Sequence, residues 1–134
     1  MIKTLIVDDS RLFRERLKAF LAAYPEVEVV GEAGDGQAAL SKAKELKPDV
    51  VLMDVKMGDM NGLDATGNLK RELPELHVII LSRYDLAAYR EAAEALGASA
   101  YVSKKDLVDK LLPAIRRVAQ TYRSKISVNK QQDE

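Results

Sequence analysis

The stretch DVVLMDVKM at residues 49–57 contains four consecutive apolar residues, Val50 to Met53, directly followed by Asp54. A continuous apolar run of this length is typical of a parallel strand covered by helices on both faces. Asp54 therefore stands where such a strand ends. Similar short apolar runs occur at residues 5–7, 27–30, 78–81 and 100–102.

Longer stretches with helical spacing separate these five runs. The apolar stripe of the first consists of Phe13, Leu17, Phe20 and Leu21, and that of the last consists of Val108, Leu111, Leu112, Ile115, Ala119 and Tyr122. Ser10 and Asp35 can cap the first two helices, Pro48 stops the second, and Gly97 should end the fourth. Five strand-then-helix units predict an α/β fold, with a doubly wound parallel sheet and five helices.

Two residues interrupt the helical pattern. Gly67 lies inside the third helix, at a cost of about 1 kcal/mol relative to alanine. Pro113 lies inside the fifth, so this helix is either kinked or begins near Leu112, with the proline in its first turn. From Ser124 onward the sequence SKISVNKQQDE is polar and shows no helical or strand periodicity of apolar residues. We therefore expect one domain over residues 1–122 and a polar tail, or the beginning of a linker, over residues 123–134.

The amino-acid composition excludes several classes of function. The 134 residues include 21 basic and 21 acidic residues, which argues against a general basic field for nucleic acid. The absence of cysteine excludes disulfides and thiolate sites, and a single histidine, His77, excludes a histidine-based zinc cluster. No apolar run is long enough for a bilayer span, so we expect a cytoplasmic protein without a membrane partner.

Polar side chains follow the strands at the edge where open α/β sheets bind ligands. Asp8 and Asp9 follow the first strand, Asp54 the third, Ser82 ends the fourth, and Lys104 follows the fifth. Each alone could be a cap, a turn residue or a surface charge. Together they form a hard-oxygen site suited to Mg²⁺, with a carboxylate that can accept a phosphoryl group.

Several stretches resemble receiver domains of two-component response regulators, and the details are most similar to receivers of helix-turn-helix transcriptional regulators. The stretches are VDDS at 7–10, DVVLMDVKM at 49–57, NGLDAT at 61–66, LS at 81–82 and GASAYVSKK at 97–105. The similarity covers residues 2 to about 122. It implies a flavodoxin-like strand order of 2-1-3-4-5.

The resemblance also implies a role for each site residue. Asp54 would accept a phosphoryl group from a sensor histidine kinase. Asp8, Asp9 and Asp54 would bind Mg²⁺, together with the backbone carbonyl of Lys56. Lys104 and Ser82 would bind the phosphoryl oxygens, and Ser82 and Tyr101 would move together as the switch.

The chain departs from the family pattern in two places, and two variable positions also bear on its function. Gly58 stands where proline is usual, which predicts a looser loop, and Asn61 stands where aspartate is common. Lys56 and Tyr84 occupy two variable positions that face the acyl phosphate. A lysine and a bulky tyrosine there predict a phosphorylated form that hydrolyses slowly.

Three function classes compete for this pattern. A signalling switch explains all five strand-end residues, and no enzyme activity is then expected beyond the chain's own phosphorylation and dephosphorylation. An aspartate-nucleophile phosphohydrolase needs a second acid where this chain has Lys56. A flavin carrier needs a phosphate-binding loop where it has two carboxylates. A switch is favoured, either as a stand-alone receiver or as the regulatory part of a DNA-binding transcription factor. It would form a homodimer on phosphorylation and reach DNA only through another domain.

Overall fold

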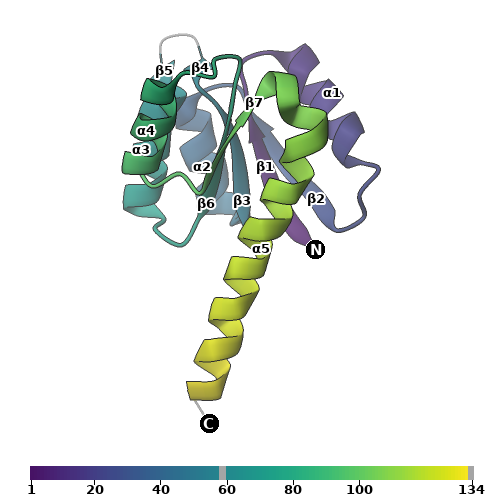
Figure 1. Ribbon diagram of the computed structural model, residues 1–134, viewed down its shortest axis with the longest axis vertical. Helices are drawn as coiled ribbons and strands as arrows, with labels where there is room; N and C mark the ends of the chain where they lie inside the picture. The colour runs from purple at the N-terminus through teal and green to yellow at the C-terminus, as the bar shows by residue number, and fades with distance from the viewer. Residues whose placement is uncertain (58–59, 133–134) are drawn as a thin grey trace.

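The computed structural model describes residues 1–57 and 60–132, with side chains described for residues 1–56 and 61–120. Its main feature is a five-stranded parallel sheet in the order β2-β1-β3-β6-β7 (Figure 1). The strands are β1 (Ile2–Val7), β2 (Val27–Ala33), β3 (Val50–Asp54), β6 (His77–Ser82) and β7 (Ala100–Ser103). Counted along the chain, this order is 2-1-3-4-5, which confirms the expected fold.

Within the described residues, five α-helices cover the two faces of the sheet. They are α1 (Arg11–Leu21), α2 (Gly36–Leu46), α3 (Gly62–Glu72), α4 (Ala87–Ala95) and α5 (Leu107–Gln132), with a short 3₁₀-helix, η1 (Lys104–Asp106), before the last. Helices α1 and α5 pack on one face, and α2, α3 and α4 pack on the other (Figure 1). This is the doubly wound arrangement expected from right-handed crossovers.

The central strand β3 explains why its sequence is apolar throughout. Val51 and Met53 belong to the core under α2, α3 and α4, whereas Val50 and Leu52 belong to the core under α1 and α5. Both faces are therefore covered, and none of these four side chains is more than 1% exposed. The strand consequently carries Asp54 to the sheet edge on a rigid support.

The predicted helix boundaries at polar residues are confirmed. The Ser10 hydroxyl accepts a hydrogen bond from the Phe13 N–H, and the Asp35 carboxylate accepts one from the Ala38 N–H. Helix α4 ends at Ala95, and Gly97 follows with a φ of 97°, a left-handed conformation that suits glycine. These caps supply hydrogen bonds to helix ends that otherwise lack partners.

Helix α5 differs from expectation. It begins at Leu107, so a start near Leu112 is wrong, and Pro113 lies in the helix interior. Val108 was expected on the buried stripe but is 71% exposed, because in the first turn of α5 it is Leu107, on the same face as Leu111 and Ile115, that packs against the core. Leu111 and Ile115 are fully buried there as expected. The side chain of Tyr122 lies outside the described residues.

Two further features of the structure were not predicted from the sequence. The backbone of α5 continues as a helix to Gln132, through much of the stretch expected to lack regular structure. Strands β4 (Lys56–Met57) and β5 (Met60–Asn61) form a small antiparallel pair after β3. Gly58, the position of the expected loose loop, lies outside the described residues. Among the helices described, none combines the length and apolar character needed to cross a bilayer.

Candidate functional site

Parallel pairing brings the predicted site residues to one edge of the sheet. Asp54 is the last residue of β3 and Ser82 is the last of β6, while Asp8 directly follows β1 and Lys104 directly follows β7. Since all four strands run in the same direction, their carboxyl ends meet at this edge. The structure therefore brings together residues that are up to 96 positions apart in the chain.

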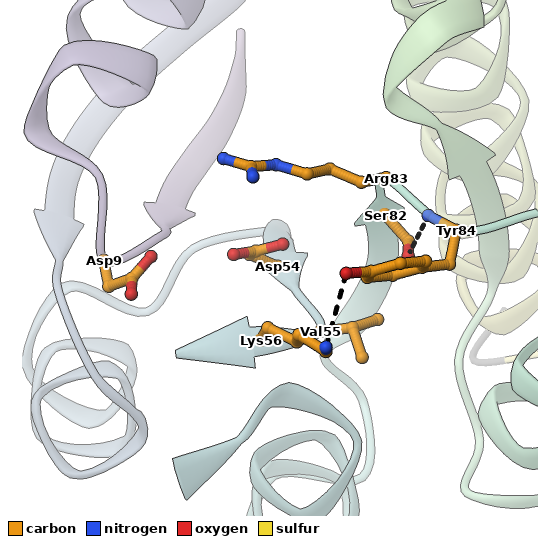
Figure 2. Close-up of a pocket in the computed structure, with 7 residues that line it drawn as sticks. All are labelled: Asp9, Asp54, Val55, Lys56, Ser82, Arg83 and Tyr84. Carbon is orange, nitrogen blue, oxygen red and sulfur yellow. Dashed lines mark hydrogen bonds between the residues drawn. The ribbon is translucent and has the colours of Figure 1, made fainter. Parts of the chain in front are cut away.

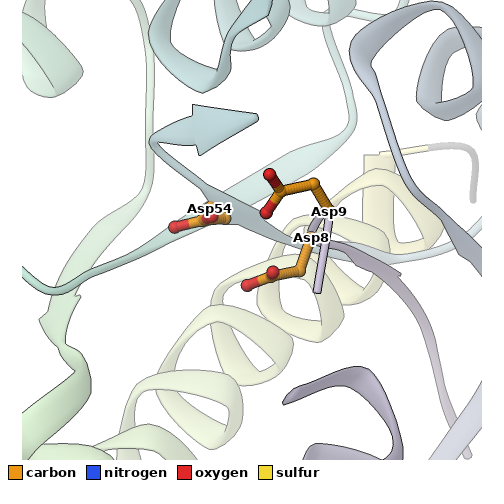
Figure 3. Close-up of side chains that lie close together, drawn as sticks. All are labelled: Asp8, Asp9 and Asp54. Carbon is orange, nitrogen blue, oxygen red and sulfur yellow. The ribbon is translucent and has the colours of Figure 1, made fainter. Parts of the chain in front are cut away.

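Three carboxylates converge at the centre of this edge (Figure 3). One oxygen atom from each of Asp8, Asp9 and Asp54 lies within 4.8 Å of the others. Asp8 and Asp54 are buried, whereas Asp9 is exposed. Buried like charges at this separation repel one another and need a compensating cation. Oxygen ligands without nitrogen or sulfur suit a hard divalent ion such as Mg²⁺.

Lys104 supplies one compensating charge from within the protein. Its Nζ lies 2.8 Å from Oδ2 of Asp8 and 3.3 Å from Oδ1 of Asp54. The same ammonium lies 3.9 Å from the ring centre of Phe13 on α1, in cation–π geometry. The lysine side chain is only 11% exposed, so these interactions are little screened by solvent.

Asp54 has a perturbed acidity. Burial raises the pKa of its carboxyl group from 3.8 to about 6, with smaller increases from the charges of Asp8 and Asp9, while Lys104 acts in the opposite direction. The carboxylate is thus ionised at neutral pH but poorly solvated. Such a group gains from a nearby cation and is a more reactive nucleophile than a hydrated carboxylate.

Asp8 is held in place by contacts on both carboxylate oxygens. Oδ1 accepts a hydrogen bond from the Ser10 N–H at 2.8 Å, and Oδ2 accepts one from Lys104. The Asp8 carbonyl accepts a further bond from Arg14 at 2.6 Å. These contacts fix the orientation of the Asp8 carboxylate within the cluster. Asp9, by contrast, is exposed to solvent.

A chain of hydrogen bonds links Ser82 to Tyr101 through the loop after β6. The Ser82 hydroxyl accepts a bond from the Tyr84 N–H at 3.0 Å (Figure 2), and the Tyr84 carbonyl accepts one from the Tyr101 hydroxyl at 2.5 Å. Nζ of Lys56 donates to the Tyr84 hydroxyl at 3.3 Å. Both pairs expected from the sequence, Ser82 with Tyr101 and Lys56 with Tyr84, are therefore connected through Tyr84.

A pocket opens beside Asp54, as Figure 2 shows. Its lining residues are Asp9, Asp54, Val55, Lys56, Ser82, Arg83 and Tyr84. Asp8 and Lys104, which are in contact with each other, are not among the lining residues. The pocket thus exposes the predicted acceptor oxygen of Asp54 to an incoming group.

Sequence reasoning missed two residues of the site. Arg83 lines the pocket although its position after Ser82 carried no motif. Gly62 lies against the backbone of Asp54, where an added Cβ would come within 1.8 Å of the Asp54 carbonyl oxygen. The Asn61-Gly62 pair was a usable signal, because glycine often marks a close backbone approach.

This geometry coincides with a clear family match. The model of the response regulator receiver domain matches residues 4–116. The chain is a member of this family of signalling domains. In its structure the three carboxylates, Lys104 and Ser82 lie at the carboxyl edge of the sheet.

Individual relatives agree with this assignment. The chain is 40% identical over 119 residues to the transcriptional regulatory protein DegU of Brevibacillus brevis, covering 89% of this chain and 50% of that protein. Its structure resembles a LuxR-family two-component response regulator from Aurantimonas sp. SI85-9A1, with a TM-score of 0.86, 28% identity and coverage of 90% of this chain and 86% of that one. It also resembles the response regulator domain of Thermotoga maritima CheB, with a TM-score of 0.81, 33% identity and coverage of 88% and 96%.

The match to DegU confirms the expected similarity to receivers of transcriptional regulators. The chain spans about half the length of the curated relatives that it matches.

Proposed function

We propose that this chain is a phospho-accepting switch, in which Asp54 receives a phosphoryl group from a sensor histidine kinase and the interaction surface then changes. The observation that carries the proposal is the placement of a buried carboxylate in an open pocket, 3.3 Å from a lysine ammonium and beside two further carboxylates. Its kinase partner and a cytoplasmic location are part of the same proposal.

The chemistry is an in-line transfer. An Asp54 oxygen forms a bond to phosphorus while the P–N bond of the phosphohistidine breaks, and the imidazole keeps the electron pair and takes up a proton. Lys104, already in contact with Asp54, neutralises charge on the transferred group. The result is an acyl phosphate on Asp54.

The carboxylates of Asp8, Asp9 and Asp54, with the backbone carbonyl of Lys56, would hold Mg²⁺. The ion would supply positive charge that neutralises the phosphoryl oxygens. These donors fit Mg²⁺, because they are clustered carboxylate oxygens. Asp9 is exposed to solvent, which suits an ion that keeps several water ligands.

Ser82 and Tyr101 would form the switch. When the Ser82 hydroxyl turns toward the phosphoryl oxygens, the Tyr84 N–H loses its acceptor, and the loop that bonds to Tyr101 must adjust. The phosphoryl group therefore favours one of two arrangements of this chain of contacts. Lys56 and Tyr84, in contact with each other at the pocket, would shield the phosphoryl group from water and slow its hydrolysis.

The similarity to DegU, a transcriptional regulatory protein, supports the proposal that the switch controls DNA binding. We propose that residues 1–122 form the receiver domain and that residues 123–134, helical as far as Gln132, belong to a tail or linker. DNA would then be bound through a separate domain, with a homodimer formed on phosphorylation. Analytical ultracentrifugation of the phosphorylated chain tests the dimer.

The central experiment uses Mg²⁺ and a small phosphoryl donor such as acetyl phosphate. Mass spectrometry should find one added phosphoryl group on Asp54. No such group should be added when Mg²⁺ is chelated before the donor is supplied. Asp54→Asn should remain unmodified. No modification of the wild-type chain, or modification that persists in Asp54→Asn, contradicts the proposed function.

A further inference from the structure

Arg83 is a cation at the mouth of the pocket that the roles assigned above do not use. It directly follows Ser82 at the end of β6 and lines the same pocket as Asp9 and Asp54. Figure 2 shows its side chain extending across the pocket, above Asp54 and toward the side from which Asp9 enters. The side chain thus lies where a group bound to Asp54 would meet solvent.

The guanidinium of Arg83 is available for a ligand. Arg14 and Arg90 are held in ion pairs with Glu32 and Asp85. For Arg83, by contrast, the part of the chain that the structure describes offers no hydrogen bond or ion pair. An unpaired arginine beside a carboxylate cluster retains all its donors for an anion.

The other cations of the pocket do not cover this side. Nζ of Lys104 contacts Asp8 and Asp54, and this lysine is not among the residues that line the pocket. Lys56 donates to the Tyr84 hydroxyl and lies 4.7 Å from the centre of that ring. A phosphoryl group on Asp54 carries several charged oxygens, and at least one of them must face the pocket mouth.

We propose that Arg83 is a further phosphoryl-contact residue, whose guanidinium binds outward-facing oxygens of the group on Asp54 while Lys104 binds from the opposite side. The inference rests on the proposed function of Asp54. A planar guanidinium suits this position because it can give two parallel hydrogen bonds to one phosphoryl group. Arg83 then stabilises the group both during transfer and in the acyl phosphate.

Beryllofluoride, which mimics a phosphoryl group on a carboxylate, provides a test that does not depend on turnover. Its affinity for the Mg²⁺-loaded chain is measured by calorimetry for the wild type, Arg83→Ala, Arg83→Lys and Arg71→Ala. Arg71 is an exposed arginine of α3 that does not line the pocket, so R71A is the matched control. We expect R83A to bind about tenfold more weakly, as for a lost hydrogen bond to a charged group, with R83K intermediate and R71A unchanged.

Two further readouts separate a phosphoryl contact from a general effect. Mg²⁺ affinity without beryllofluoride should not fall in R83A, because Arg83 contacts the phosphoryl group and not the ion. With acetyl phosphate as donor, R83A should raise KM more than it lowers kcat, since one binding contact is lost in the ground state as well as in the transition state.

The outcomes are distinguishable. If the wild type binds beryllofluoride, Asp54→Asn does not, and R83A binds as tightly as the wild type, the role of Arg83 is overturned and the proposed function stands. If R71A weakens binding as much as R83A, the effect is one of net charge and the contact is likewise overturned. If the wild type binds no beryllofluoride, both the contact and the proposed function fail.

Discussion

The phenolic hydroxyl of Tyr101 donates a 2.5 Å hydrogen bond to the main-chain carbonyl of Tyr84. This bond joins β7 to the loop after β6, and the same loop residue donates its N–H to Ser82. The Tyr101 ring is also held from outside, because the Arg90 guanidinium lies 4.7 Å from its centre. The position of Tyr101 is thus coupled to that of Ser82 through one intervening residue.

Tyr101→Phe should loosen this loop without emptying the space that the ring occupies. The variant keeps the Arg90 contact and loses only the hydroxyl, so we expect a loss of about 1 kcal/mol in the free energy of unfolding. Amide hydrogen exchange in residues 83–86 should become faster. Tyr89→Phe is the control, since among the described residues no hydrogen bond of the Tyr89 hydroxyl occurs. Unchanged exchange in Tyr101→Phe would show that the bond does not hold the loop.

The raised pKa of Asp54 predicts that the free energy of unfolding of the metal-free chain depends on pH. The folded protein holds the Asp54 proton up to pH about 6, whereas the unfolded chain releases it near 3.8, so folding binds a proton between these values. The contribution of Asp54 is most favourable below this window and is lost as pH rises through it. A shift of this size corresponds to a loss of at most about 3 kcal/mol, which solvent in the open pocket reduces by screening the charge of Asp54.

The prediction is tested by urea unfolding of the wild type and Asp54→Asn in a chelator, from pH 4 to pH 8. D54N should be the more stable at pH 7.5, and the difference should shrink toward pH 4. Asp9→Asn is the matched control, because it removes an exposed carboxylate of the same cluster without relieving burial. A difference between wild type and D54N that does not vary with pH would contradict the raised pKa.

The sequence predicted the sheet and the site edge for physical reasons that can be named. Val50 to Met53 are apolar because both faces of β3 are covered, and this burial is visible as a continuous run. Asp54, Ser82 and Lys104 were recognisable because strand ends are defined by where such runs stop. Parallel pairing then brings those ends together without further information.

Other features depend on information that no local pattern contains. The β4–β5 pair has two residues in each strand, too few to show a period. Val108 fits the helical stripe in the sequence, but the rotation of α5 on the sheet turns Leu107 and Leu111 to the core and leaves Val108 exposed. Arg83 is one of many surface arginines in the sequence, and only the fold places it at the pocket.

Gly62 and Gly67 occupy the same helix, α3, but substitution by alanine should destabilise the protein much more at Gly62 than at Gly67. A Cβ at Gly62 would meet the Asp54 carbonyl oxygen at 1.8 Å, a backbone atom that cannot move without displacing the acceptor. At Gly67 the nearest atom is the Leu96 Cδ2 at 3.2 Å, the end of a flexible side chain. G62A should therefore cost more than about 2 kcal/mol, whereas G67A should change stability by less than about 1 kcal/mol, because improved helix propensity offsets the contact.

Thermal and chemical unfolding of both variants measure this contrast, and beryllofluoride binding reports on the acceptor. G62A should weaken that binding even under conditions where the variant is folded, since the Asp54 backbone is displaced. Equal stability of G62A and G67A would mean that the chain relaxes around Gly62 without cost.

Tyr84 should control how long the acyl phosphate lasts. Its ring lines the pocket, and its hydroxyl accepts a hydrogen bond from Lys56 at 3.3 Å, so the two side chains together cover the approach to Asp54. Tyr84→Ala opens this approach to water, and we expect dephosphorylation about fivefold faster, equivalent to about 1 kcal/mol in activation free energy. Tyr84→Phe retains the ring and loses only the Lys56 bond, so its rate should stay close to that of the wild type.

The measurement follows loss of the phosphoryl group from Asp54 after removal of excess donor, at constant Mg²⁺. Lys56→Ala separates shielding by the ring from shielding by the pair, because the ring then remains while its cationic partner is lost. If the ring is the barrier to water, K56A should be affected less than Y84A. Dephosphorylation of Y84A at the wild-type rate would remove Tyr84 from this role, since the backbone bonds of residue 84 to Ser82 and Tyr101 are available to alanine as well.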